Sequence, residues 1–233
     1  MRKISLFRKM DDRGAIGIGA MIVLIAMILV AGVAASVLIT TSNTIQSQAM
    51  KTGAQTTREV ASGLTVFNVI GQVNTTTDNV SGATTYNDIW KVAITVSPKP
   101  GSEKIDLNNT YILISDGSTK ALLTYAYSNS SAYDDDVTGD IFAQITNWSA
   151  LSNDTFGIGV LQDYDGSMSQ TNPVMTRGDK AILYLYTNSS YVFNSQISER
   201  KEIFGRVIPE VGAPGVVSFT SPKAYVDKIY TVQ

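Results

Sequence analysis

Hydrophobic residues are concentrated in one continuous run near the N-terminus. Residues 15–39 read AIGIGAMIVLIAMILVAGVAASVLI and carry no charge, and the uncharged stretch continues as far as Met50. A run of 25 nearly continuous apolar residues exceeds the roughly 20 that a helix needs to cross a bilayer. This run predicts a helix that is apolar on every side and must be surrounded by apolar material.

The helical pattern continues beyond this run. Residues 40–67 contain no proline, and Val60, Leu64 and Phe67 follow one another at spacings of four and three, as one stripe of a helix requires. We therefore expect a helical segment over residues 15–66, with its regular part ending near Leu64. At 1.5 Å per residue it would be ~75 Å long, far longer than the ~30 Å hydrocarbon core of a bilayer.

From about residue 67 the hydrophobic pattern changes to a period of two, which indicates strands. The expected strands are residues 89–97, 111–115, 121–128, 141–146, 157–162, 181–187, 216–220 and 224–232. Turn signals such as Pro98-Lys99-Pro100-Gly101 fall between them. The predicted fold class is α+β, with a long N-terminal hydrophobic α-helix followed by an immunoglobulin-like antiparallel β-sandwich over residues 67–233.

Composition excludes several classes of function. The formal net charge is −2 and no basic stripe is present, which argues against nucleic-acid binding. The chain has no cysteine and no histidine, so it lacks disulfides, thiolate nucleophiles, the usual zinc ligands and the commonest general base. Phosphate-binding loops, nucleophile elbows and dinucleotide fingerprints are also missing. We therefore expect no enzyme activity, no catalytic residue, no cofactor and no metal.

A metal site remains an alternative, because two groups of loop carboxylates could bind a hard cation such as Ca²⁺. They are Asp134, Asp135, Asp136 and Asp140 in one group, and Asp163 and Asp165 in the other. Neither group completes an EF-hand loop, which needs a bidentate Glu at its twelfth position. Solvated loop acids are the favoured interpretation.

Residues 1–14 read MRKISLFRKMDDRG and carry a net charge of +3, so the positive-inside rule would keep them cytoplasmic. Three interpretations of the N-terminal region remain open. An ordinary secretory signal would be cut after Ala35, although its apolar stretch would exceed the usual 7–15 residues. A plain membrane anchor would not be cut. A leader cut between Gly14 and Ala15 would leave the apolar helix on the mature protein.

The residues around Gly14 favour the third interpretation. Charged residues precede this lone glycine, whose small size lets a peptidase approach the backbone, and the apolar run begins at the next residue. The segment Arg13-Gly14-Ala15-Ile16-Gly17-Ile18-Gly19 resembles the class III signal peptides of type IV pilins and archaeal flagellins (archaellins). Bacterial type IV pilins typically carry Glu at the fifth mature position, where this chain has Gly19, so the archaellin start is the more similar one.

The C-terminal part extends this resemblance. Arg177-Gly178-Asp179-Lys180 followed by AILYLYT is similar to the archaellin pattern of a Gly-Asp turn that enters a hydrophobic strand. The closing segment also looks like that of the family, with Ile208-Pro209-Glu210, Gly212-Ala213-Pro214-Gly215 and Phe219-Thr220-Ser221-Pro222. The resemblance covers residues 15–70 and 174–233 and is weak between them.

The resemblance implies a structural subunit of the archaellum, the rotating archaeal motility filament, with its precursor in the cytoplasmic membrane and the assembled filament extracellular. It implies a homopolymer with sister archaellins, and as further partners a preflagellin peptidase and a membrane assembly platform with its ATPase. An adhesive archaeal type IV pilus-like subunit is the alternative function. A membrane-anchored enzyme or binding protein is a third hypothesis, which the missing catalytic motifs disfavour.

Leader removal would leave an apolar helix that first lipid and then other copies of the chain could surround. The small residues between Ala31 and Ser36 allow neighbouring helices to approach closely, and non-closing contacts between copies would produce a filament. The residues that we expect in the filament core are Ile16, Ile18, Ile22, Ile25, Leu29 and Val33.

Asn-X-Ser/Thr sequons are more frequent than the serine and threonine content predicts by chance, and none lies in the helix. The candidate N-glycosylation sites are Asn74, Asn79, Asn108, Asn129, Asn147, Asn153 and Asn188. A glycosylated surface domain explains this excess, and the resemblance to archaellins supports it. The alternative is a surface generally rich in Asn, Ser and Thr.

Overall fold

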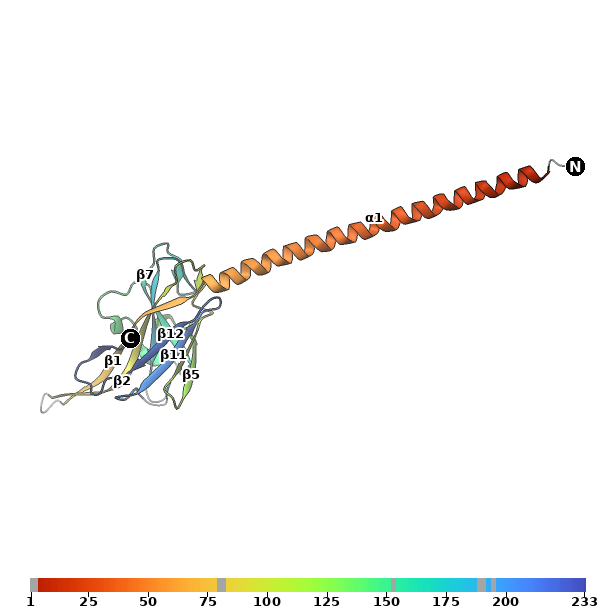
Figure 1. Ribbon diagram of the computed structural model, residues 1–233. Helices are drawn as coiled ribbons and strands as arrows, with labels where there is room; N and C mark the ends of the chain where they lie inside the picture. The colour runs from red at the N-terminus through yellow and green to blue at the C-terminus, as the bar shows by residue number, and fades with distance from the viewer. Residues whose placement is uncertain (1–3, 79–82, 152–153, 188–191, 194–195) are drawn as a thin grey trace. The chain divides into compact units, whose positions relative to one another are not determined.

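The computed structural model describes residues 4–78, 83–151, 154–187, 192–193 and 196–233. The chain divides into two compact units, residues 1–55 and residues 56–233. One helix, α1 (Ile4–Ala61), forms the first unit and contributes its last turns to the second, as Figure 1 shows. We call the second unit the β-domain.

Helix α1 ends at Ala61, before the end expected from the hydrophobic pattern. The spacing of Val60, Leu64 and Phe67 is not a helical stripe, because Leu64 and Phe67 both belong to the first strand. Leu64 is buried in the β-domain, whereas the side chain of Phe67 is 59% exposed. At its other end α1 begins at Ile4, so the described part of residues 1–14 is helical as well.

The β-domain is built from thirteen strands in its described residues. They are β1 (Leu64–Thr77), β2 (Thr84–Pro98), β3 (Ile105–Asp106), β4 (Tyr111–Ser115), β5 (Lys120–Tyr125), β6 (Tyr133–Asp134), β7 (Thr155–Gln162), β8 (Met168–Ser169), β9 (Asn172–Met175), β10 (Lys180–Tyr186), β11 (Glu202–Ile208), β12 (Gly215–Thr220) and β13 (Ile229–Thr231). The main sheet has the order β12-β11-β4-β5-β7-β10-β2-β1-β13, with β6 beside β7, and β3, β9 and β8 form a small second sheet. All described pairs are antiparallel except β5–β7 and β6–β7.

The main sheet folds into two layers around one hydrophobic core. We call β12, β11, β4 and β5 the β4 layer, and β7, β10, β2, β1 and β13 the β2 layer. Ile114 and Val207 of the β4 layer and Ile94 and Leu183 of the β2 layer are all fully buried in the same core. Alternate residues of each strand face this core, as in a β-sandwich. The predicted helix and antiparallel β-sandwich are therefore confirmed.

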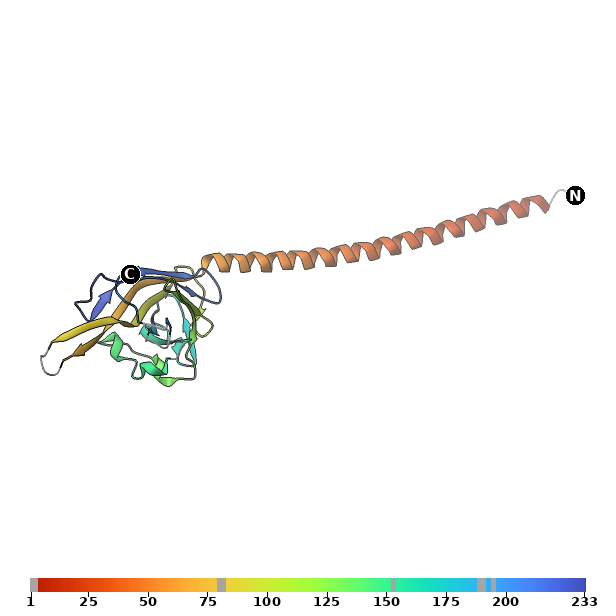
Figure 2. The same cartoon turned by 90° about the horizontal axis from the view of Figure 1, so that it is seen from below.

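A second hydrophobic cluster lies on the outer side of the β2 layer. Ile182 and Tyr184 of β10 pack there against Phe142, Trp148 and Leu151. The covering segment, residues 126–151, contains three short 3₁₀ helices: η1 (Ser130–Ala132), η2 (Ile141–Ala143) and η3 (Trp148–Ala150). Figure 2 shows this segment in green on the opposite side of the domain from the blue strands of the β4 layer.

The predicted strand at residues 141–146 is wrong. The Asp140 carboxylate accepts a hydrogen bond from the backbone N–H of Phe142 at 3.0 Å and caps η2 there. Phe142 and Ile145 are both buried, and this spacing of three fits a 3₁₀ turn rather than the alternation of a strand.

The other strand predictions differ in extent. Residues 224–232 form a strand only at β13, because Tyr225 turns into the core and its hydroxyl donates to the Ile197 carbonyl at 2.9 Å. Six strands, β1, β3, β6, β8, β9 and β11, were not predicted. The remaining six expected strands correspond to β2, β4, β5, β7, β10 and β12.

Candidate assembly helix and modification sites

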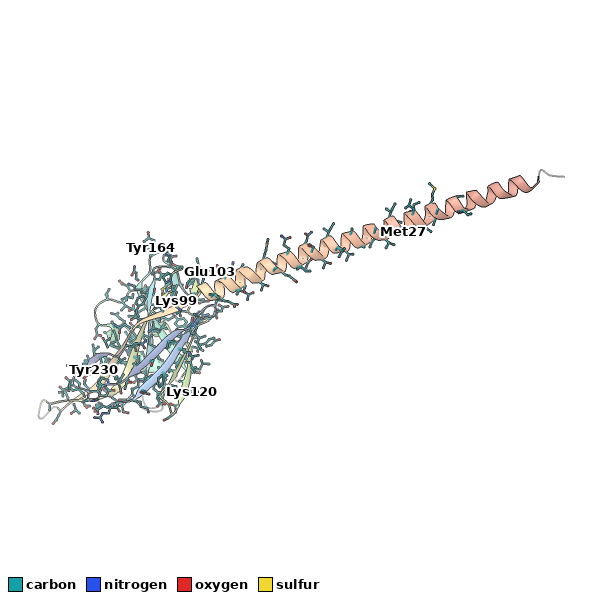
Figure 3. The ribbon with its side chains drawn as sticks, in the orientation of Figure 1. Met27, Lys99, Glu103, Lys120, Tyr164 and Tyr230 are labelled. Atoms are coloured by element: carbon teal, nitrogen blue, oxygen red, sulfur yellow. The ribbon has the colours of Figure 1, made fainter. Side chains whose placement is uncertain are left out.

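The outer surface of α1 is apolar and uncovered. The six residues expected in the filament core are between 58% exposed at Ile25 and 72% exposed at Ile16. The side chain of Met27, labelled in Figure 3, is 65% exposed on the same helix. Apolar surface of this extent is rare on a soluble monomer and indicates a surface that lipid or another protein covers.

The same helix meets the length and composition of a membrane span. Within the described residues, Ile16–Ala61 is long and apolar enough to cross a bilayer and lies near the N-terminus. Lipid and a bundle of identical helices are both environments that would remove these side chains from water.

The expected cleavage site lies within α1. Gly14 is exposed, and a Cβ added there would meet no atom within 4 Å. The surroundings of Gly14 in the subunit therefore do not require a glycine at this position. Any requirement for a small residue would come from the peptidase.

Two of the candidate glycosylation sites present exposed asparagines. Asn108 lies in the turn before β4, and Asn147 lies at the N-terminus of η3. The side-chain oxygen of Asn147 accepts a hydrogen bond from the Ser149 hydroxyl at 2.7 Å, so the two residues that define this sequon are in contact. Both positions leave room for a bulky polar group.

Two other candidates are half-buried. Asn74 lies within β1. Asn129 caps η1: its side-chain oxygen accepts from the Ser131 N–H at 3.0 Å, and its Nδ2 donates to the Ala150 carbonyl at 3.2 Å. A glycan on Nδ2 would have to be accommodated beside this last contact. Asn79, Asn153 and Asn188 lie outside the described residues.

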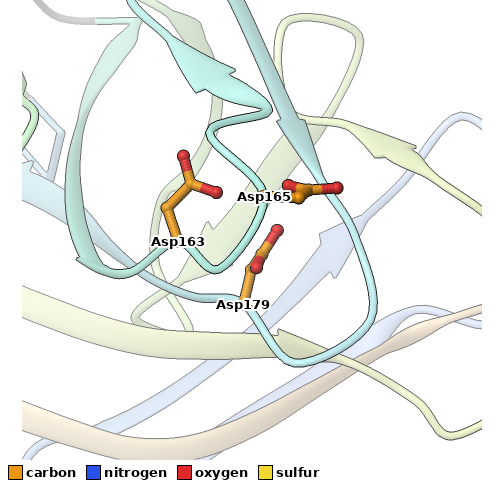
Figure 4. A group of neighbouring side chains, drawn as sticks. All are labelled: Asp163, Asp165 and Asp179. Carbon is orange, nitrogen blue, oxygen red and sulfur yellow. The ribbon is translucent and has the colours of Figure 1, made fainter.

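Three carboxylates converge at one end of the sandwich, as Figure 4 shows. Asp163 and Asp165 follow β7 and Asp179 precedes β10, and carboxylate oxygens of all three lie within 4.8 Å of one another. The sequence suggested the first two as cation ligands, whereas Asp179, 14 residues further along the chain, was expected only in the turn before a strand. Among the described residues, these three carboxylates form the group whose oxygen atoms could hold a hard cation.

Hydrogen bonds within the loop also satisfy these carboxylates. The buried Asp179 accepts from the Thr176 N–H at 2.7 Å and from the Tyr164 N–H at 3.2 Å. Asp163 accepts from the N–H groups of Ser167 and Met168. Hydrogen bonding from Ser167, and further from Thr176, lowers the pKa of the Asp165 carboxyl. The three acids thus already tie the β7–β8 loop to the turn before β10.

Trp148 packs the covering segment against the β2 layer. Its ring packs edge-on against Tyr184 with centroids 5.5 Å apart, and its Nε1 donates to the Phe142 carbonyl. The ammonium of Lys91 lies 4.6 Å from the Trp148 ring centroid and 4.4 Å from that of Trp90. Burial, and then the charge of Lys228, lowers the pKa of Lys91. Trp148 is therefore a packing residue.

The sequence did not reveal how the chain leaves α1. The backbone N–H of Gly63 donates to the Ser102 hydroxyl at 2.9 Å, and the Gly63 carbonyl accepts from the Lys99 N–H at 2.9 Å. Arg58, in the last turn of the helix, forms an ion pair with Glu103 at 3.1 Å. The segment that follows β2 thus binds the residues on both sides of the helix end.

Comparison with known proteins identifies the family. The family model of archaeal-type flagellins matches residues 14–219. The chain is 46% identical to flagellin B2 of Methanocaldococcus jannaschii over 225 residues, which cover 95% of this chain and 94% of that protein. It is 38% identical to flagellin B3 of Thermococcus kodakarensis, covering 97% of this chain and 100% of that protein.

Solved structures agree with this assignment. The crystal structure of archaeal flagellin FlaB1 from Methanocaldococcus jannaschii matches with a TM-score of 0.60 at 34% identity, over 74% of this chain and 98% of that chain. The archaeal flagellum of Methanospirillum hungatei matches with a TM-score of 0.59 over 93% of this chain and 98% of that chain, at 16% identity, and so supports the fold. The chain belongs to the archaeal-type flagellin family. It is a structural subunit of the archaellum.

Proposed function

We propose that the chain is made as a membrane precursor and polymerises through its N-terminal helix once the leader, residues 1–14, has been removed. The observation that carries this proposal is the apolar surface of α1, where the six candidate core residues are all more than half exposed in a chain of the flagellin family. Lipid would cover this surface before assembly, and neighbouring helices would cover it in the filament.

Charge supports the orientation of the precursor. The leader carries +3 and the rest of the chain −5, so the leader would stay cytoplasmic and residues 67–233 would lie outside. Cleavage between Gly14 and Ala15 would then take place on the cytoplasmic side. Helix α1 from Ala15 to Ala61 would form the filament core, and the β-domain, whose first strand begins at Leu64, would form the outer domain of an extracellular filament.

Assembly of this kind requires several partners. A preflagellin peptidase would remove the leader, and a membrane assembly platform with its ATPase would transfer the subunit from the bilayer into the filament. Sister archaellins are expected beside identical copies of the chain in the polymer. The flagellin relatives support a motility filament rather than the adhesive alternative.

The outer domain would carry N-linked glycans. Asn108 and Asn147 are the favoured acceptors because both are exposed and lie outside the sheets. Asn74 and Asn129 are less accessible, and Asn79, Asn153 and Asn188 are candidates from the sequence.

N-terminal sequencing of protein sheared from the cell surface tests the processing step, and we expect it to begin at Ala15. A start at Ser36 would mean ordinary signal cleavage and would remove the proposed core from the mature subunit. Deletion of the gene tests the motility role, with swimming and surface attachment scored separately in a strain without other flagellin genes. Normal swimming with lost attachment would contradict the proposal.

A further inference from the structure

The outer face of the β4 layer is an uncovered surface made of two rows of side chains that cross four strands. The pairing of the strands places Leu122, Leu113, Arg206 and Val216 in one row. It places Lys120, Ser115, Phe204 and Ser218 in the neighbouring row. We call these eight residues the β4 face. Lys120, at the end of one row, is labelled in Figure 3.

The β4 face is apolar at positions where a solvated sheet would be polar. The side chains of Leu122, Phe204 and Val216 are 53%, 52% and 58% exposed. A groove of about 350 Å³ lies among the residues of the face. The outer face of the β2 layer differs, because residues 126–151 cover it with Phe142 and Trp148. An exposed apolar surface with polar residues around it is typical of a protein contact.

The distribution of sequons favours a contact with protein. None of the seven sequons lies in β4, β5, β11 or β12. Asn129 and Asn147 lie on the segment that covers the opposite layer, and Asn74 lies on β1. Asn108 lies in the turn before β4, outside the eight residues of the face. Glycans are bulky and solvated, so glycans at these four positions would lie beside the β4 face or away from it and not on it.

Charge indicates what the β4 face would bind. It carries the cations Lys120 and Arg206, with Glu202 further along β11 beyond Phe204. The covering segment on the opposite side of the domain presents Asp135, Asp136 and Asp140, all exposed. Two complementary surfaces on opposite sides of one domain can join copies head to tail without closing a ring, which is the contact that a filament needs.

We propose that the β4 face is a contact between outer domains in the filament and that it binds residues 133–140 of a neighbouring copy. Lys120 and Arg206 lie opposite the acidic residues of that segment, and the contact removes Leu122, Phe204 and Val216 from water. This inference rests on the proposed polymerisation and adds a second contact to the one between the helices.

Cysteine cross-linking tests the contact against a clean background, because the chain has no native cysteine. Filaments of the double variant Arg206→Cys/Asp136→Cys are treated with a flexible bismaleimide and separated by denaturing electrophoresis. We expect a ladder of covalent oligomers. The single variants should give only monomers, and so should Arg206→Cys/Tyr164→Cys, whose second cysteine replaces an 88% exposed residue outside the acidic segment.

The outcomes separate this inference from the proposed function. Wild-type cells without filaments would overturn the proposed function and this inference with it. Intact filaments without a ladder would overturn only the inference. Dimers from the single Arg206→Cys variant would also overturn it, because they would show two β4 faces meeting each other.

Charge exchange provides an answer that does not depend on the cysteine variants. Filaments of Arg206→Glu should dissociate at a lower temperature than the wild type, and Arg206→Glu/Asp136→Arg should recover most of that loss. Arg206→Glu filaments as stable as the wild type, or a double variant weaker than either single one, would overturn the pairing.

Discussion

Gly63 and Ala213 form an isolated parallel β-bridge just beyond the end of helix α1. The Ala213 N–H donates to the Ser62 carbonyl at 2.8 Å, and the Leu64 N–H donates to the Ala213 carbonyl at 3.1 Å. A Cβ added to Gly63 would lie 2.7 Å from that carbonyl oxygen. Because the obstacle is backbone, only a glycine lets the two segments pair this closely.

Replacing Gly63 should therefore destabilise the β-domain. We expect Gly63→Val to lower its free energy of unfolding by about 1–3 kcal/mol, because the bridge to Ala213 must open to admit the side chain. Thermal unfolding followed by circular dichroism in the β-sheet region measures this. Gly53→Ala is the control, since a Cβ added there meets no atom within 4 Å and the helix gains up to about 1 kcal/mol. Equal stability of Gly63→Val and the wild type would contradict the role of the bridge.

The ion pair between Lys201 and Asp116 should make stability depend on pH. Its atoms are 2.8 Å apart. Burial disfavours the charged carboxylate, but the Lys201 ammonium and the N–H groups of Thr119 and Ser118 outweigh burial and hold the pKa of Asp116 well below its ordinary value of 3.8. The stabilisation is therefore complete above about pH 4 and is lost as the pH falls below that value towards the pKa of the folded state.

We expect Lys201→Met to lower the free energy of unfolding at pH 7 by about 1–2 kcal/mol, because solvent screens a pair in which the lysine side chain is 28% exposed. The variant should also lose less stability than the wild type on acidification. Denaturant titrations at pH 7 and pH 3 measure both effects. Lys223→Met, at an exposed lysine, serves as the control. Parallel pH dependence in the variant and the wild type would rule out this coupling.

A charge in the apolar part of α1 should block assembly. The Ile25 side chain is 58% exposed on the isolated subunit and lies near the middle of the apolar run. Ile25→Asp would place a carboxylate where lipid or neighbouring helices are expected, at a cost of roughly 2.5–3.5 kcal/mol on insertion scales. Electron microscopy should show no filaments from this variant, while Ile25→Leu should assemble normally. Normal filaments from Ile25→Asp would count against a tightly packed helical core.

Enlarging Gly14 should stop processing. The subunit itself has room for a side chain there, so the effect of Gly14→Phe would arise in the peptidase. We expect uncleaved precursor to accumulate in the membrane, visible as a band of higher mass on immunoblots. Gly17→Phe, at the third residue of the expected mature segment, tests whether a bulky side chain anywhere near the junction is sufficient to block cleavage. Normal cleavage of Gly14→Phe would show that processing does not take place at Gly14.

Removal of the Asn147 sequon should lower the mass of the subunit by one glycan. Asn147→Gln removes the acceptor, and Ser149→Ala removes the sequon while leaving the asparagine in place. Both variants should lose the mass of the glycan beyond the small change that each substitution itself makes in intact-protein mass spectrometry, whereas Thr146→Ala should keep the glycan. A mass that differs from that of the wild type only by the substitution, in either of the first two variants, would show that Asn147 is not used.

Local pattern was sufficient for the parts of this protein that depend on neighbours in sequence. The apolar run at residues 15–39 predicted the helix, because an uncharged stretch of that length has few other stable conformations in lipid or in a bundle. The alternation in β12 predicted a strand because one of its sides faces the core and the other is exposed. β10 was predicted from a short apolar run, and it is buried on both sides. The residues around Gly14 led to the flagellin family, which the comparisons confirmed.

Contacts between distant segments were decided only by the tertiary structure. Residues 141–146 do not form the predicted strand, because Phe142 and Ile145 pack in one cluster with Tyr184, more than 35 residues away in sequence. Just after the helix, Gly63 lies against the backbone of Ala213, 150 residues away in sequence. Asp179 lies near Asp163 only because the loop after β7 meets the turn before β10. The apolar surface of the helix could be predicted from local pattern, because it is made of residues that follow one another in the sequence. These contacts could not, because each depends on the geometry that the folded sandwich imposes on remote parts of the chain.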